Sequence, residues 1–271
     1  MKTRIIAAAI LLPLLLVVVL VLPKVVTAIL FGLMCALAAY ELLYGTGLVT
    51  HARLVIYSAV MAFMVSIWSY CGCPYVWGLV GVMVFVGLLF GEMMLSHVKL
   101  RFEKIAVCLA AGILFPFFLT SLVRIHAVKL GRFFILIPFV MAFLSDTGAY
   151  FTGKALGKHK LAPVISPNKT VEGVVGGVFG AVIGMMIYAV VLQFGFHLKV
   201  NYFYAFIYGF LGSLAAVFGD LSFSVIKRQT GIKDYGKLIP GHGGILDRFD
   251  SMMVVGPLAE LLLLLIPMAV K

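Results

Sequence analysis

The sequence predicts an all-α, polytopic integral membrane protein. Of its 271 residues, 63% are hydrophobic and only 11% are charged, and the mean hydropathy is +1.17. This much apolar surface exceeds what the core of one soluble domain of this length can bury. About nine apolar stretches are long enough to cross a hydrocarbon layer of roughly 30 Å. Because backbone polar groups find no water inside lipid and no alternating strand pattern is present, each stretch is expected to be a helix.

The predicted spans follow one another with short connections. The first, 5–22, opens with Lys2 and Arg4 as a signal peptide does, but it lacks a small-residue cleavage site, so it is interpreted as a retained span. Trp68 and Trp77 flank the loop after the third span, where membrane-interface aromatics belong. The other eight spans are expected at 25–44, 53–70, 74–95, 104–123, 132–151, 173–194, 202–219 and 251–270.

The positive charges predict the orientation. With nine spans, the N-terminus and the loops after even-numbered spans share one side of the membrane, and that side carries most of the 21 Lys and Arg residues. The positive-inside rule places this side in the cytoplasm, with the chain in the cell (inner) membrane. The polar loops of the second half are therefore expected to face the cytoplasm.

The aspartates divide the chain into two parts. All of them lie after residue 131, whereas the carboxylates of 1–130 are glutamates. We interpret 1–130 as a helical scaffold and 131–271 as the half that carries the chemistry. No linker rich in Gly, Pro or Ser separates them, so 1–271 is expected to be a single membrane domain.

A first polar cluster lies at the end of the sixth span. Asp146 and Tyr150 are four residues apart and share a helix face. An uncompensated charge near lipid costs roughly 2.5–3.5 kcal/mol on insertion scales. Asp146 is therefore a candidate metal ligand or a group that orients one; the alternative is a structural ion pair with Lys154 or Lys169.

A second cluster is the segment 166–173, SPNKTVEG. Ser166 followed by Pro167 fits a helix N-cap with proline at the first helical position. Such a helix would direct free backbone N–H groups and Lys169 at an anion, so Ser166 and Lys169 are expected to bind phosphate. The alternative for Glu172 is a pairing with Lys169.

A third cluster begins where the eighth span ends. Asp220, Ser224 and Lys227 are four and three residues apart, so one helix face presents a carboxylate, a hydroxyl and an ammonium group. After a glycine-rich loop, Asp247 and Asp250 return on one face at the start of the ninth span, so Asp220 and Asp247 would share a metal. Carboxylates suit a hard divalent cation, and Lys and Arg neutralise phosphate. The pattern indicates phosphoryl or nucleotidyl transfer.

The whole segment 224–250 reads S-x2-KR-x4-KD-x5-P-x-HGG-x2-DR-x-D. It resembles the signature of the phosphatidate cytidylyltransferases, also called CDP-diacylglycerol synthases, and so many fixed spacings make a chance match rare. The segment 166–173 also resembles the S-P-x-K-T-x-E-G element of this family. The resemblance implies that the phosphate of phosphatidic acid attacks the α-phosphorus of CTP, giving CDP-diacylglycerol and pyrophosphate for phospholipid biosynthesis, with Mg²⁺ and room for a second cation.

This interpretation assigns roles to particular residues. His242 would hydrogen-bond a phosphate oxygen or the leaving group, and Gly243 and Gly244 would let the backbone approach phosphate. The catalytic residues would be Asp220, Asp247, Lys227 and His242. The substrate-binding residues would be Ser166, Lys169, Ser224, Arg228, Lys233, Gly243, Gly244 and Arg248. The metal ligands would be Asp220, Asp247, Asp250 and Asp146.

Other functions fit the sequence less well. A CTP-dependent lipid kinase would need a base for a neutral hydroxyl, and an anion transporter would carry charges near the middle of the membrane. The net charge of +11 suits CTP, phosphatidic acid and membrane lipids; no nucleic-acid-binding motif is present, so no nucleic acid is expected. The family resemblance implies a homodimer, which no residue of the sequence indicates by itself.

Overall fold

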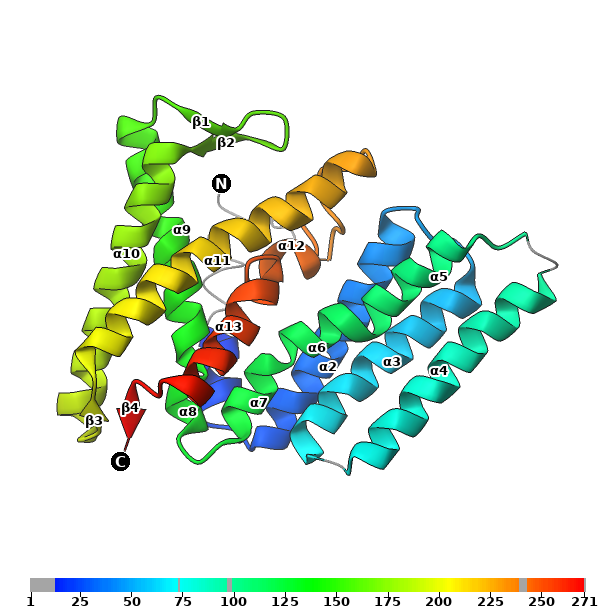
Figure 1. Cartoon of the computed structure of the whole chain (residues 1–271), viewed down its shortest axis with the longest axis horizontal. Coiled ribbons are helices and arrows are strands. Elements are labelled where there is room, and N and C mark those ends of the chain that lie inside the picture. The colour runs from blue at the N-terminus through cyan, green and yellow to red at the C-terminus, as the bar shows by residue number, and fades with distance from the viewer. Residues whose placement is uncertain (1–12, 73, 97–98, 239–242, 271) are drawn as a thin grey trace. The chain divides into compact units, whose positions relative to one another are not determined.

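Helices form nearly all of the regular structure in the computed structural model, which describes residues 13–72, 74–96, 99–238 and 243–270 (Figure 1). Within these ranges, seven helices are long and apolar enough to cross a membrane. They coincide with the second to eighth predicted spans, which confirms an all-α polytopic membrane protein. The first predicted span lies partly outside the described residues; of it, 13–20 is helical.

The chain divides into two compact units. The first unit contains the residues before Lys129 together with Lys227–Phe249, and the second contains Lys129–Ile226 and Asp250–Lys271. Helix α11 (Tyr202–Gln229) contributes residues to both. The functional division at residue 130 within a single domain stays a prediction.

The first unit is built from four long helical stretches that lie side by side (Figure 1). Its elements are α2 (Lys24–Tyr40), the π-helical turn η1 (Glu41–Gly45), α3 (Ala52–Cys71), α4 (Tyr75–Leu95), α5 (Phe102–Leu109), η2 (Ala110–Leu114), α6 (Phe115–Leu119), α7 (Ser121–Ala127) and α12 (Leu246–Phe249). The Lys24 ammonium donates to the carbonyls of Ala127 (2.9 Å) and Val128 (3.0 Å). This bond pair ties the beginning of α2 to the end of α7, because a cation compensates the free carbonyls of a helix C-terminus.

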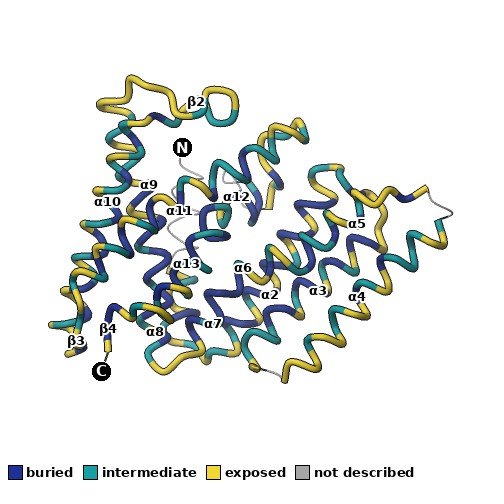
Figure 2. The backbone as a smooth tube through the Cα atoms, viewed as in Figure 1, coloured by how far each residue is buried: buried dark blue, intermediate teal, exposed yellow. Residues whose placement is uncertain are grey.

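Helix α4 is the least buried long helix of the first unit (Figure 2). Phe85 and Leu89 are its buried side chains, while large apolar residues such as Trp77 and Met83 are exposed. In water such a surface would drive association. In a membrane the same surface is satisfied by acyl chains, so the pattern suits a lipid-facing helix.

The second unit pairs two long helices through a small hairpin. Its elements are α8 (Gly131–Phe134), α9 (Leu136–Leu156), β1 (Lys160–Ala162), β2 (Ser166–Thr170), α10 (Val171–Val190), η3 (Val191–Gly195), β3 (Lys199–Val200), α11 to Ile226, α13 (Met252–Leu265) and β4 (Ala269–Val270). The antiparallel strands β1 and β2 join the ends of α9 and α10 (Figure 1). The sequence did not predict this hairpin.

Glycines set the distance between α9 and α10. A Cβ atom on Gly148 would overlap the carbonyl of Gly176, and one on Gly180 would overlap the carbonyl of Leu144. Small residues of this kind let helix backbones approach inside lipid, where association depends on close packing rather than on the hydrophobic effect. The packing fixes the ends of α9 and α10, which carry the hairpin.

The ninth predicted span is shorter than expected. In place of a helix over 251–270, α13 has 14 residues, and the chain then forms β4, which pairs with β3. At 1.5 Å per residue α13 is about 21 Å long, less than the roughly 30 Å of a hydrocarbon core. The helix ends because Ile266 precedes Pro267 and adopts φ −139°, outside the helical region.

Candidate active site

In the first unit, Asp247 is a buried carboxylate held by three donors. Its side chain is 2% exposed. One oxygen, Oδ2, accepts hydrogen bonds from the backbone N–H groups of Tyr235 (2.8 Å) and Gly244 (2.9 Å). The other, Oδ1, accepts from the Lys227 ammonium at 3.1 Å. A charge this deeply buried persists only when it is paired and hydrogen-bonded, as it is here.

The local sequence explains how Lys227 and Asp247 come together. Helix α11 ends in a Schellman motif, in which Gly231 has φ 71° and Ile232 donates to the carbonyl of Lys227. The chain then turns back toward α12. Gly243 has φ 86°, and a Cβ atom there would lie 2.7 Å from Oδ2 of Asp247, so glycine is required at this close approach.

Glu41 is a second buried carboxylate of the first unit, and sequence reasoning missed it. It is 5% exposed and accepts from the backbone N–H groups of Ile245 (3.0 Å) and Leu246 (2.8 Å). We assigned its segment to a scaffold because every aspartate lies after residue 131, and the contacts of Glu41 with residues 204 and 205 positions away have no signal in local sequence. The available signal was a carboxylate within an apolar run, which needs compensation.

In the second unit, Asp220 pairs with Lys169. Its Oδ2 lies 2.7 Å from the Lys169 ammonium, and its Oδ1 accepts from the Ser224 hydroxyl at 3.1 Å. The two charged side chains are 31% and 23% exposed. The predicted alignment of Asp220 and Ser224 on one helix face is confirmed.

The predicted N-cap at Ser166 is wrong. Ser166 begins strand β2, opposite Ala162, and helix α10 begins at Val171. The cap is Thr170, whose Oγ1 accepts from the backbone N–H of Gly173 at 3.1 Å. Threonine serves because it caps helices nearly as well as serine and also tolerates the extended backbone at the end of a strand.

The alternative that Glu172 pairs with Lys169 is also wrong. Its carboxylate accepts from the backbone N–H groups of Lys158 and His159 and lies 2.6 Å from the His159 ring nitrogen Nδ1. Glu172 therefore fastens the start of β1, which leaves Lys169 to pair with Asp220.

Thr170→Val tests the observed cap. The substitution keeps the shape and β-branching but removes the acceptor, so the free energy of unfolding should fall by about 1 kcal/mol. Thermal unfolding in detergent measures the change. Thr147→Val is the matched control, because the Thr147 hydroxyl bonds the Phe143 carbonyl inside α9 and caps no helix end. Equal effects of the two substitutions would contradict the capping role.

Five of the remaining predicted site residues are at least partly exposed. Asp146, Arg228, Lys233 and Arg248 are exposed, and Asp250 is partly exposed. A Cβ atom on Gly219, next to Asp220, would lie 2.9 Å from the carbonyl of Asp250. His242 is outside the described residues. Because Asp220 and Asp247 belong to different units, their shared metal stays a prediction.

The donor set fits a cation that brings ligands of its own. In the part of the chain that the structure describes, no three His, Cys, Asp or Glu side chains form a metal-binding group. Magnesium does not need one, because it is commonly bound by one or two carboxylates plus water and substrate phosphates. Oδ1 of Asp247 accepts one hydrogen bond among the described contacts and so keeps a lone pair for a cation.

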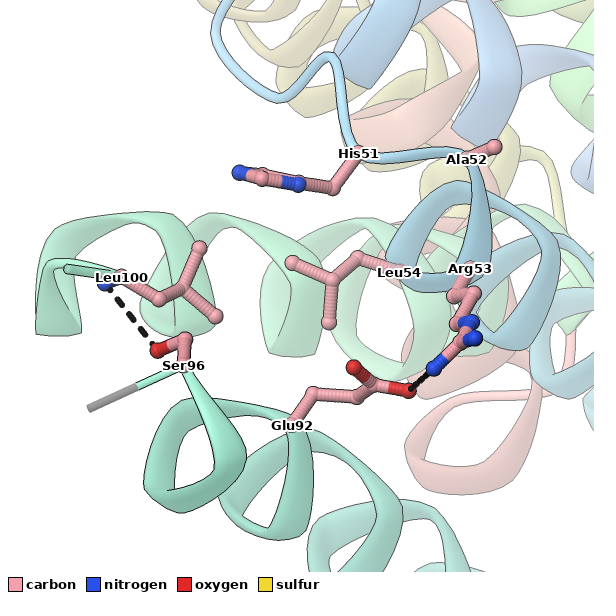
Figure 3. Close-up of a pocket in the computed structure, with 7 residues that line it drawn as sticks. All are labelled: His51, Ala52, Arg53, Leu54, Glu92, Ser96 and Leu100. Carbon is pink, nitrogen blue, oxygen red and sulfur yellow. Dashed lines mark hydrogen bonds and ion pairs between the residues drawn. The ribbon is translucent and has the colours of Figure 1, made fainter. Parts of the chain in front are cut away.

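The first unit also contains a cavity that other residues line (Figure 3). Its volume is about 300 Å³, and it lies between the start of α3 and the end of α4. The side chains of Arg53 and Glu92 form an ion pair across it at 3.3 Å, so the positive and negative charges of these two lining residues cancel. The lining residues are His51, Ala52, Arg53, Leu54, Glu92, Ser96 and Leu100. None of them is a predicted site residue.

The fold and these clusters define a helical membrane protein in which two lysine–carboxylate pairs, Lys227–Asp247 and Lys169–Asp220, lie next to glycine residues. Such an arrangement is suited to phosphate chemistry. The chain belongs to the cytidylyltransferase family, whose model matches residues 2–266. This match confirms the family resemblance of the 224–250 signature.

Curated relatives carry a common name. The chain is 46% identical over 134 residues to the phosphatidate cytidylyltransferase of Staphylococcus saprophyticus, covering 49% of this chain and 50% of the relative. It is 40% identical over 182 residues to that of Staphylococcus haemolyticus, covering 65% and 66%. It is 41% identical over 174 residues to that of Staphylococcus aureus strain COL, covering 63% of each. The similarity thus spans between half and just under two thirds of these relatives.

Proposed function

We propose that the chain transfers the cytidylyl group of CTP to phosphatidic acid, forming CDP-diacylglycerol and releasing pyrophosphate. The observation that carries this proposal is the family match over residues 2–266, which includes the whole 224–250 signature. The names of the relatives supply the lipid substrate.

The chemistry suits the residues described above. A phosphate monoester is already anionic near neutral pH, so the attacking oxygen needs little help from a base. The larger demands are to bring two anions together and to stabilise pyrophosphate as it leaves. Lys227 and Lys169 hold positive charge beside the two carboxylates, and the exposed Arg228, Lys233 and Arg248 would neutralise the triphosphate and the lipid phosphate.

Magnesium is the cofactor that this proposal includes. Asp220 and Asp247 would hold it, with Asp250 and Asp146 as further ligands or orienting groups. Bound there, the metal would neutralise phosphate oxygens and fix their orientation. Asp247 is suited to this role because its backbone donors and Lys227 already fix the direction of its free lone pair.

We further propose that the loop between α11 and α12, residues 230–245 of the signature (the signature loop), and the N-terminus face the cytoplasm of the cell membrane, where CTP is found. The predicted first span, 5–22, part of which lies outside the described residues, would add a further crossing to the seven long helices, and acyl chains would stay in the bilayer. A homodimer is part of the proposal, on the family resemblance alone.

Transfer of label from CTP tests the reaction. Purified protein in detergent is given Mg²⁺, phosphatidic acid and CTP labelled at either the α- or the γ-phosphorus. Cytidylyl transfer carries α-label into the lipid and γ-label into pyrophosphate. Lipid labelled from the γ-position would identify a kinase instead. Labelled CTP or phosphate taken up by proteoliposomes, with no labelled lipid, would identify a transporter.

A further inference from the structure

Glu41 connects a membrane helix to the signature loop. It is the first residue of the π-helical turn η1, at the end of the span Lys24–Gly45. Single π-helical turns occur often at functional sites. Here the turn begins at a carboxylate residue that is 5% exposed.

The contacts of Glu41 are with the loop backbone. Its two carboxylate oxygens accept from Ile245 and Leu246, the two residues that precede Asp247. A Cβ atom on Gly236 or Gly244 would overlap the carboxylate. The loop therefore has a glycine at each place where it meets Glu41: Gly236 after α11 and Gly244 before α12.

Glu41 and Asp247 together hold the described backbone on either side of residues 239–242, at Tyr235 and at 244–246. Asp247 binds the N–H groups of Tyr235 and Gly244, and Glu41 binds the next two N–H groups along the chain. Backbone N–H groups must be satisfied when buried, and here two carboxylates satisfy them instead of a strand or a long helix. Lys227 lies 3.1 Å from Asp247, so its charge is fixed by the same framework.

We infer that Glu41 is a positioning residue of the proposed transfer reaction, an inference that rests on the proposed function. It holds the segment before Asp247 so that this carboxylate and Lys227 are placed to meet the triphosphate and its cation. Both oxygens of Glu41 are engaged by backbone N–H groups of the loop, so Glu41 acts through the loop.

Glu41→Gln tests the inference. The amide keeps the size of the side chain, but its NH₂ group faces one of the two backbone donors, so one hydrogen bond and the charge are lost. We expect kcat to fall about 10-fold or more and the Mg²⁺ concentration for half-maximal rate to rise, because partners that orient metal ligands typically contribute 10- to 100-fold. A purely structural role would lower the amount of active protein and leave the Mg²⁺ requirement unchanged.

Two further variants separate charge from position. In Gly236→Ala the added methyl group would overlap the Glu41 carboxylate and displace it without changing any charge. This variant should therefore also show the raised Mg²⁺ requirement. Glu92→Gln makes the same carboxylate-to-amide change in the same unit, at the Arg53 pair of the cavity, and it should leave the kinetics unchanged.

Limited trypsin digestion gives a readout that does not depend on activity. Lys233 and Lys237 are exposed residues of the loop, and a fixed loop is cleaved slowly because cleavage needs local opening. Glu41→Gln should accelerate cleavage there several-fold and Glu92→Gln should not.

The outcomes are distinct. Unchanged cleavage in Glu41→Gln, or faster cleavage with wild-type kcat and Mg²⁺ requirement, would overturn the positioning role. A folded wild-type protein without transferase activity would instead overturn the proposed function and the kinetic part of this inference. The cleavage rates would then still decide whether Glu41 holds the loop.

Discussion

Asp247→Asn should lower the rate of cytidylyl transfer by about 10²- to 10³-fold, the range typical for removal of one preorganised electrostatic group. The asparagine oxygen can still accept from the N–H groups of Tyr235 and Gly244. Its NH₂ group then faces the Lys227 ammonium, donor against donor, and no lone pair is left on that side for a cation. The initial rate of CDP-diacylglycerol formation measures the loss.

The same substitution should also destabilise the protein. Removing one partner of a buried ion pair typically costs about 3–5 kcal/mol, because the other charge stays buried. Lys227 is 12% exposed, so the cost should be large. Adding Lys227→Met to Asp247→Asn removes both charges and should restore most of the thermal stability but none of the activity. Recovery of activity in the double variant would contradict a chemical role for this pair.

Asp220→Asn should cause a loss of activity of similar size, about 10²-fold or more, with little change in stability. The Asp220–Lys169 pair is partly exposed, and such pairs contribute at most about 1 kcal/mol. Transfer rates and thermal unfolding midpoints, measured on the same preparations, separate the two effects.

Glu103→Gln is the control for Asp220→Asn, since it makes the same change in the exposed Arg101–Glu103 pair. It should affect neither rate nor stability. If Asp220→Asn retained the wild-type rate, Asp220 would be a structural partner of Lys169 and not a group of the active site.

Sequence patterns predicted the long helices because one physical requirement determines them. A backbone in lipid must satisfy its own hydrogen bonds, so an apolar run of about 20 residues has no other stable conformation. The same criterion overestimated the last span, because composition alone did not show that Pro267 ends α13 at Leu265. Spacing along one helix likewise predicted that Asp220 and Ser224 lie together.

The remaining contacts depend on packing between distant segments. Glu41 meets residues more than 200 positions away, and Lys169 binds Asp220 rather than Glu172, three residues from it. Local pattern also could not choose between Ser166 and Thr170 as the cap, because both residue types cap helices well. The choice follows from the hairpin, whose pairing extends to Thr170 opposite Lys160.

Release of pyrophosphate by the purified protein tests metal-dependent cytidylyl transfer most directly. CTP, Mg²⁺ and phosphatidic acid are supplied together, and each is then omitted in turn. The proposed reaction predicts release only when all three are present, in amounts equal to the CDP-diacylglycerol formed. Release that continues without the lipid or without a divalent metal, or no release from folded protein, would contradict it.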